Sequence, residues 1–94
     1  MTIEEFAQKV QEAEQESLRR HDMACEANLI NTIAHVKPGT KWTKVDIGYS
    51  GRYMINPEGE IYGIKAYGVP HYGHPYGTLD KPSAACFKGL WDRL

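Results

Sequence analysis

His71 and His74 form an H-x-x-H pair in a segment rich in glycine and proline, and imidazole is suited to both acid–base chemistry and metal binding near neutral pH. A metal site needs at least three protein ligands, and no other His, Cys, Asp or Glu stands at a recognisable interval. An enzymatic interpretation pairs a histidine with Asp46 or Asp80, but the chain offers no evident nucleophile. In a third interpretation, the two histidines lie at the surface and form hydrogen bonds to the local backbone. In a fourth, they contact an anion or a nucleobase. We expect no metal, no cofactor and no catalytic residue.

Aromatic side chains gather in the second half of the chain, next to basic ones. All six tyrosines and Trp42 follow Gly39. Rings beside cations can stack nucleobases and hold phosphates, or they can anchor a protein partner. Alternatively, the rings cover the space that glycines leave in the strands. The predicted binding residues are Lys44, Arg52, Lys65, Tyr67, His71, Tyr72, His74 and Tyr76.

The segment Gly48-Tyr49-Ser50-Gly51-Arg52 could present backbone N–H groups to a phosphate, with a guanidinium beside them. It does not precede a helix, so it lacks the context of the known phosphate-binding loops. We expect a plain turn at Ser50-Gly51.

The elements that would position these residues form a small antiparallel sheet. Residues 41–47 alternate between apolar and polar side chains, as a half-buried strand does. Residues 52–56 and 60–66 are predicted strands, joined by Asn56-Pro57-Glu58-Gly59, a sequence typical of a type I turn in a bulged hairpin. We expect three strands, or four with a short edge strand over residues 76–79. Residues 67–76 are predicted to form an ordered loop.

A polar helix is predicted for the N-terminal arm, where Thr2 and Glu5 have the spacing of a capping box. Apolar and small residues form a narrow seam on this helix, and we expect the seam to pair with a second copy. After Asp22, a second helix or a continuation of the first is expected to reach about His35 and to end before Pro38-Gly39. The predicted self-association residues are Ile3, Phe6, Val10, Ala13 and Ser17.

The predicted fold class is α+β in a single domain over residues 1–94. It comprises a helical arm (1–38), an antiparallel β unit with a Gly-, Tyr- and His-rich loop (39–80) and a short C-terminal helix (81–94). Residues 1–39 carry seven acids and four Lys/Arg, whereas residues 40–94 carry seven Lys/Arg and five acids, so an anionic ligand is expected on the second half. The absence of a signal segment and of an apolar run of ~18 residues predicts a cytoplasmic protein that does not bind membranes. Two widely spaced cysteines predict reduced thiols.

The segment from Lys41 to Leu79 resembles small uncharacterised accessory proteins of bacteriophages and prophages. The resemblance rests on Lys41–Asp46, Ser50–Met54, Gly59–Val69, His71, Gly73-His74 and Tyr76-Gly77, with Gly-Ile-Lys-Ala-Tyr-Gly as its most specific part. It implies an origin in a short phage gene, and it transfers no catalytic residue. Such accessory products include inhibitors of host defence, among them anti-CRISPR proteins and proteins that sequester cyclic nucleotides.

Sequence and resemblance together lead us to expect a non-enzymatic binding protein that antagonises a host protein or protein complex in the host cytoplasm. Three alternatives stay open at this point. They are a protein that binds or sequesters a nucleotide or cyclic nucleotide, a hydrolase or nuclease that uses the histidine pair, and a component of virion assembly.

Overall fold

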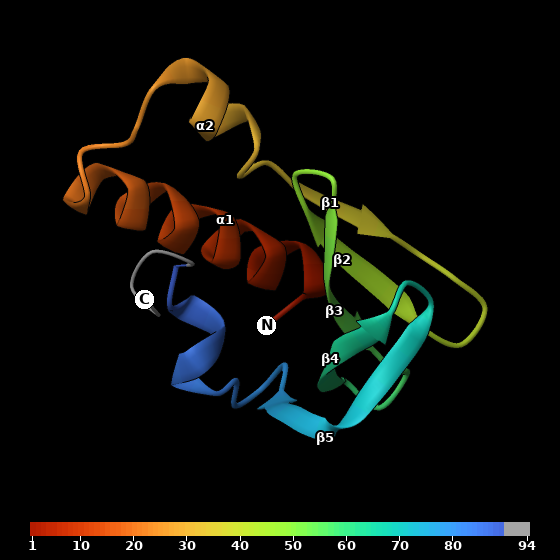
Figure 1. Cartoon of the computed structure of the whole chain (residues 1–94). Helices are drawn as coiled ribbons and strands as arrows, with labels where there is room; N and C mark the ends of the chain where they lie inside the picture. The colour runs from red at the N-terminus through yellow and green to blue at the C-terminus, as the bar shows by residue number, and fades with distance from the viewer. Residues whose placement is uncertain (90–94) are drawn as a thin grey trace.

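The computed structural model describes residues 1–89 and confirms the α+β class. Two helices, α1 (Ile3–Arg20) and α2 (Glu26–Ile30), precede a five-stranded sheet. The strands are β1 (Ala34–Lys37), β2 (Thr43–Ile47), β3 (Ser50–Ile55), β4 (Glu60–Ala66) and β5 (Val69–Thr78). They lie in the order β1-β2-β3-β4-β5, and every neighbouring pair is antiparallel. A 3₁₀ helix, η1 (Ala84–Phe87), follows (Figure 1).

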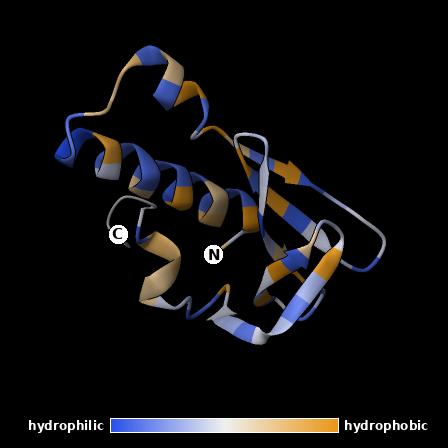
Figure 2. Cartoon of the chain, viewed as in Figure 1, coloured by the Kyte–Doolittle hydropathy of each residue, from blue (hydrophilic) through white to orange (hydrophobic). Residues whose placement is uncertain are grey.

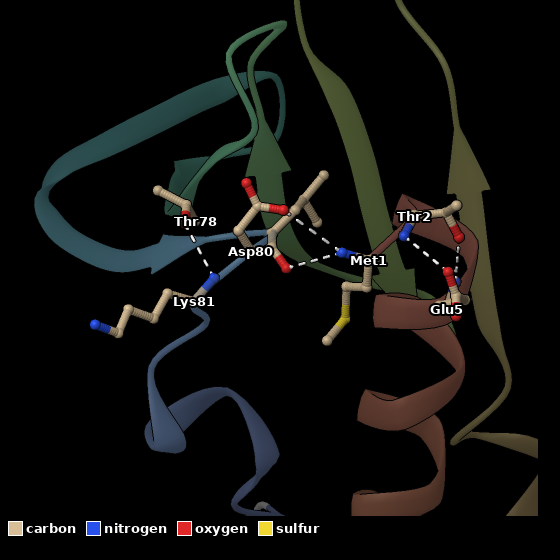
Figure 3. A network of polar contacts seen from close by, with 7 residues as sticks. Met1, Thr2, Glu5, Thr78, Asp80 and Lys81 are labelled. Atoms are coloured by element: carbon tan, nitrogen blue, oxygen red, sulfur yellow. Dashed lines mark hydrogen bonds and ion pairs between the residues drawn. The ribbon is translucent and has the colours of Figure 1, made fainter.

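The predicted capping box at the start of α1 is confirmed. The backbone N–H of Glu5 donates to Thr2 Oγ1 at 3.1 Å, and the backbone N–H of Thr2 donates to a Glu5 carboxylate oxygen at 3.0 Å. Figure 3 shows these bonds beside a second contact, in which the N-terminal ammonium lies 3.3 Å from the carbonyl oxygen of Leu79 and 3.8 Å from Asp80. The start of α1 is therefore held against the segment that follows β5.

The interpretation of the α1 seam as a self-association surface was wrong. Phe6, Val10 and Ser17 are at most 1% exposed, and the two apolar ones belong to the core that α1 forms with the sheet. Ile3 packs on the same core, and Ala13 is half-buried. The seam is narrow, yet it is enough to pack α1 on the sheet, because the strands beneath it contribute apolar side chains of their own. The remaining positions of α1 carry the polar residues that made it resemble a projecting arm.

The segment after Asp22 also differs from the prediction. Asp22 has a φ of 55°, and α2 spans only five residues. Ala34–Lys37 forms the edge strand β1, where a helix reaching His35 was expected. Pro38-Gly39 therefore lies in the connection between two strands of one sheet, and it does not separate a helical arm from a β unit.

The hairpin between β3 and β4 confirms the predicted turn at Asn56-Pro57-Glu58-Gly59, with Gly59 at a φ of 82°. The turn predicted at Ser50-Gly51 was wrong, because these residues begin β3. The chain reverses two residues earlier at Gly48-Tyr49, where Gly48 has a φ of 62°. Glycine at the first central position is typical of a type II′ hairpin turn.

The predicted loop over residues 67–76 is mostly a strand. β4 and β5 are joined by a tight turn at Tyr67-Gly68, where Gly68 has a φ of 85°. The pairing of β5 with β4 shifts register at three points. These irregularities accommodate Pro70 and Pro75, which lack an N–H group and are tolerated on an edge strand. The expected short strand over residues 76–79 overlaps the end of β5.

At the C-terminal end, the structure shows one turn of 3₁₀ helix capped by Ser83, whose hydroxyl accepts from the N–H of Ala85 at 3.3 Å. A helix over residues 81–94 was expected. The last part of that predicted helix, residues 90–94, lies outside the described residues.

The core lies between α1, η1 and one face of the sheet. The Phe6 ring meets the rings of Tyr53 and Phe87 at centroid distances of 5.4 Å and 5.9 Å. Figure 2 shows hydrophobic residues along α1 and on the strands behind it, while most of β5 is coloured pale blue to white. Val45, Ile55 and Ile61 complete this layer from the sheet side. The opposite face, here called the outer face, is covered by no helix within residues 1–89.

Candidate functional site

The outer face of the sheet is defined by the cross-strand register. Lys37 pairs with Lys44, Lys44 with Met54, and Met54 with Tyr62, so these four side chains form one row across β1 to β4. The Met54 side chain points to the outer face, because its neighbours Tyr53 and Ile55 point to the core. It is nevertheless only 1% exposed, although no described helix lies on this face. Long polar and aromatic side chains of the outer face cover Met54.

An aromatic cluster of Trp42, Tyr62 and Tyr72 lies at one end of this row. The centroids of Tyr62 and Tyr72 are 5.3 Å apart, and Trp42 lies 5.9 Å from Tyr62 and 6.1 Å from Tyr72. All three contacts are edge-to-face, an arrangement that favours mutual packing of rings. Tyr72 is 64% exposed, so the cluster presents a large aromatic surface to solvent. The Lys41 ammonium lies 5.9 Å from the Trp42 ring and borders the cluster.

A second group, here called the Asp46 cluster, continues along the outer face with Asp46, Lys37, Tyr67 and Lys44. The Lys37 ammonium lies 3.0 Å from Asp46 Oδ2, and the Tyr67 hydroxyl donates to the same oxygen at 3.3 Å. The hydrogen bond to Asp46, together with the charge of that carboxylate, raises the pKa of Lys37. Lys44 lies over the Tyr67 ring at 4.7 Å, so the ring is flanked by two cations.

The side chain of Asp46 is unusual for a surface-facing carboxylate. The residue is 3% exposed, and its Oδ1 atom has no hydrogen-bond partner among residues 1–89. Gly51, the cross-strand neighbour of Asp46, leaves space for this arrangement. A Cβ atom at Gly51 would lie 2.9 Å from the Tyr67 ring, so glycine is needed for that ring to reach Asp46.

The histidine pair is brought together, with the rings of His71 and His74 4.3 Å apart on β5. The carboxylates considered as acid–base partners are placed elsewhere. Asp46 is engaged by Lys37 and Tyr67, and the side chain of Asp80 is 99% exposed beside the N-terminus. Within the described part of the chain, no group of three or more His, Cys, Asp or Glu side chains is placed to hold a metal ion.

Two of the predicted binding residues lie away from the outer face. Arg52 points toward α1, where its Nη1 donates to Glu14 Oε1 at 2.8 Å. Tyr76 packs its ring at 5.2 Å from Tyr53 on the core side. Lys65 is exposed on β4. The structure thus unites Lys44, Tyr67 and Tyr72 on the outer face and separates Arg52 and Tyr76 from them.

The hypothesis of a phosphate-binding turn at residues 48–52 is not favoured by the backbone. The N–H of Gly48 donates to the carbonyl oxygen of Ile33 at 2.8 Å. Ser50 and Gly51 pair with β2 as part of the sheet. The N–H group of Gly48 is therefore already occupied inside the protein.

Sequence reasoning missed the contribution of Lys37 to the site and gave Asp46 a different role. Lys37 was assigned to the end of a helix, which hid its place in a strand beside β2. The available signal was the alternation of Ala34, His35, Val36 and Lys37 between apolar and polar residues, although four residues are too few to distinguish a strand from a helix end.

No protein-family model, no curated protein and no solved structure matches the chain. None of the helices within residues 1–89 combines the length and the hydropathy that a bilayer crossing requires.

Proposed function

We propose that this chain is a non-enzymatic binding protein that acts by occupying a partner protein with the outer face of its sheet. The observation that carries the proposal is the aromatic cluster of Trp42, Tyr62 and Tyr72, exposed on a face that no described helix covers. Tyrosine and tryptophan are enriched among the residues that dominate protein interfaces, because they bury a large area at a small cost in side-chain entropy.

The charges around the cluster indicate the chemistry of the partner. Lys41 borders the Trp42 ring, and Lys37 and Lys44 lie over the neighbouring Tyr67 ring. The carboxylate of Asp46 beside them is buried and paired with Lys37. An acidic surface with room for the aromatic side chains would complement this face.

The biological setting of the proposal comes from the resemblance of residues 41–79 to bacteriophage accessory proteins. We place the partner among host defence factors, with the chain as a stoichiometric antagonist of the anti-CRISPR type, acting in the cytoplasm of the host cell. The residues on which the resemblance rests include part of the outer face, namely Trp42, Tyr62 and Tyr67, and this overlap supports the proposal.

The test begins with a pull-down of tagged protein from host lysate, followed by titration of the recovered partner after purification. Tyr72→Ala removes the most exposed ring of the cluster, and we expect it to weaken binding at least tenfold, as truncation of an interface anchor does. Tyr49→Ala is the matched control, because Tyr49 is 95% exposed and lies on the β2–β3 turn outside the cluster.

Unchanged affinity of Tyr72→Ala for the partner would contradict the proposal, as would equal losses in both variants. Recovery of a nucleotide without any protein, or turnover of a nucleotide or nucleic acid by the purified chain, would also overturn it. Both outcomes are measurable in the same preparation by mass spectrometry of the retained material.

A further inference from the structure

A cavity of about 340 Å³ lies between α1, α2 and the β2–β3 turn, and its lining includes no residue of the aromatic cluster. Its walls include Leu18 of α1, Asn28 of α2, Ile47 of β2 and Tyr49 of the turn, and the Glu14–Arg52 ion pair also lines it. This volume lies near the lower end of the range of small-molecule sites, about 300–1,000 Å³.

The polar groups of this cavity are fixed before any ligand arrives. The side chains of Arg52 and Glu14 are 21% and 7% exposed, and they are joined by a bond of 2.8 Å. A guanidinium has five N–H donors, and Glu14 is the one hydrogen-bond partner of Arg52 among residues 1–89. Arg52 therefore retains donors for an acceptor group of a ligand while one of its N–H groups is bonded to Glu14.

Asn28 supplies the complementary group. Its Nδ2 donates to the carbonyl oxygen of Met23 at 2.8 Å, which orients the amide and leaves Oδ1 as an acceptor. Donors of Arg52 and an acceptor of Asn28 in one cavity match a ligand edge that carries both an acceptor and an N–H group. Leu18 and Ile47 contribute apolar side chains to the same lining.

The Tyr49 ring stands at the rim of the cavity and is 95% exposed. A fully exposed aromatic residue next to a cavity offers a flat surface on which a planar ring can stack. The backbone turn that carries it is fixed by the bond from the N–H of Gly48 to Ile33. The backbone that carries the ring is thus anchored, while the faces of the ring remain open to solvent.

We propose that this cavity binds a nucleobase, as the base of a nucleoside or a nucleotide. The base stacks on Tyr49, its acceptor receives an N–H of Arg52, and its N–H group donates to Asn28 Oδ1. The N–H of Gly48 is not available to a phosphate, and the guanidinium of Arg52 is already paired with a carboxylate, so the site recognises the base and not the phosphate. This site is independent of the proposed protein-binding face.

The test is calorimetric titration of the whole chain with adenosine, guanosine, cytidine and uridine, with their 5′-monophosphates and with inorganic phosphate. We expect at least one nucleoside to bind, its monophosphate to bind within about threefold of it, and phosphate alone to give no heat. Tyr49→Ala should weaken that nucleoside about tenfold, because loss of one base–aromatic stack has an effect of this size. The exposed position of Tyr49 makes loss of folding an inadequate explanation of such a result.

Tyr72→Ala is the matched control and should bind the nucleoside as the wild type does, since Tyr72 lies in the aromatic cluster. Shifts of the Asn28 side-chain amide and of the Arg52 Nε–H signals in NMR spectra on titration would locate the ligand in the cavity. No binding by any nucleoside at millimolar concentration would overturn the proposal, as would phosphate binding alone or unchanged binding by Tyr49→Ala. Because Tyr49 and Tyr72 report on different surfaces, failure here is distinguishable from failure of the protein-binding proposal.

Discussion

At the scale of single residues, Asp46 shows how one buried carboxylate organises the outer face. Oδ2 accepts from both Lys37 and Tyr67, while Oδ1 has no partner within residues 1–89. Burying a carboxylate costs free energy unless it is paired, and Lys37 supplies that pairing. The ion pair with Lys37 and the hydrogen bond from the Tyr67 hydroxyl offset this cost, and both contacts fix side chains that lie on the surface.

A first prediction concerns the pKa of Lys37. Asp46→Asn removes both the charged acceptor and its field, so we expect the pKa of Lys37 to fall toward its ordinary value. The pKa of Lys37 is higher in the folded protein than in the unfolded chain, where it is about 10.4. The stabilisation that charged Lys37 contributes is therefore complete at a pH below the unfolded pKa, and it is lost as the pH rises through the folded pKa. NMR titration of the lysine side-chain signals measures the shift.

Tyr67→Phe is the control for this prediction, because it removes the hydroxyl and keeps the ring. The bond to Asp46 is the larger cause of the raised pKa of Lys37, so most of the shift should remain in Tyr67→Phe. A Lys37 pKa that is the same in the wild type and in Asp46→Asn would show that the ion pair does not form in solution.

At the scale of elements, the capping box ties the stability of α1 to pH. Thr2→Ala removes the hydroxyl that caps Glu5, and we expect the free energy of unfolding to fall by about 1 kcal/mol. The bond from the Thr2 backbone N–H lowers the pKa of Glu5 in the folded protein. The stabilisation that the Glu5 carboxylate contributes is therefore present at a pH above the unfolded pKa, and it is lost as the pH falls through the folded pKa.

Urea unfolding at neutral pH and near pH 3 measures both effects. Glu5→Gln serves as the comparison, because an amide keeps an acceptor oxygen but does not titrate in this range. The wild type should lose more stability than Glu5→Gln on acidification. Equal losses in the two proteins would mean that the Glu5 carboxylate does not accept the bond seen here.

Elements with strong local signals were predictable, and those that depend on distant neighbours were not. The β3–β4 hairpin follows from Pro57 and Gly59, whose backbone preferences alone specify a turn. β5 was expected to be a loop because its glycines and prolines favour irregular structure. It becomes a strand because pairing with β4 outweighs those preferences, with register shifts absorbing the poor fit.

The candidate site was predictable in composition and only partly in position. Lys44, Tyr67 and Tyr72, which were predicted as binding residues, lie together on the outer face. Arg52 and Tyr76 were grouped with them because they share the same residue types. Only the packing of α1 and η1 against the sheet reveals that one pairs with Glu14 and the other contacts the core.

At the scale of the whole molecule, the division expected at Pro38-Gly39 does not exist, because residues on both sides contribute to one sheet and one core. β1 precedes Pro38 and pairs with β2, and the side chain of Gln11 on α1 accepts from the backbone N–H of Ala34 at 2.8 Å. α1 is therefore an integral layer of the fold. Its removal would expose the apolar face of all the strands that it covers.

Phe6→Ala tests this role of α1. Phe6 is fully buried between Tyr53 and Phe87, so truncation leaves a cavity and should lower the free energy of unfolding by about 3–5 kcal/mol. Domains of this kind are stable by only about 5–15 kcal/mol, so the loss should be visible as a large fall in the urea midpoint. Gln8→Ala, on the exposed side of the same helix, should change stability by no more than about 0.5 kcal/mol.

The same variant separates a core helix from a dimerising one. If Phe6 packs inside its own chain, the urea midpoint of the wild type should not depend on protein concentration. Phe6→Ala should then lower that midpoint equally at a low protein concentration and at roughly fifty times that concentration. A helix that paired with a second copy through Phe6 would instead give a loss that grows with concentration, together with a change of mass in sedimentation. That pattern would contradict the packing of α1 on the sheet and restore the seam as an intermolecular surface.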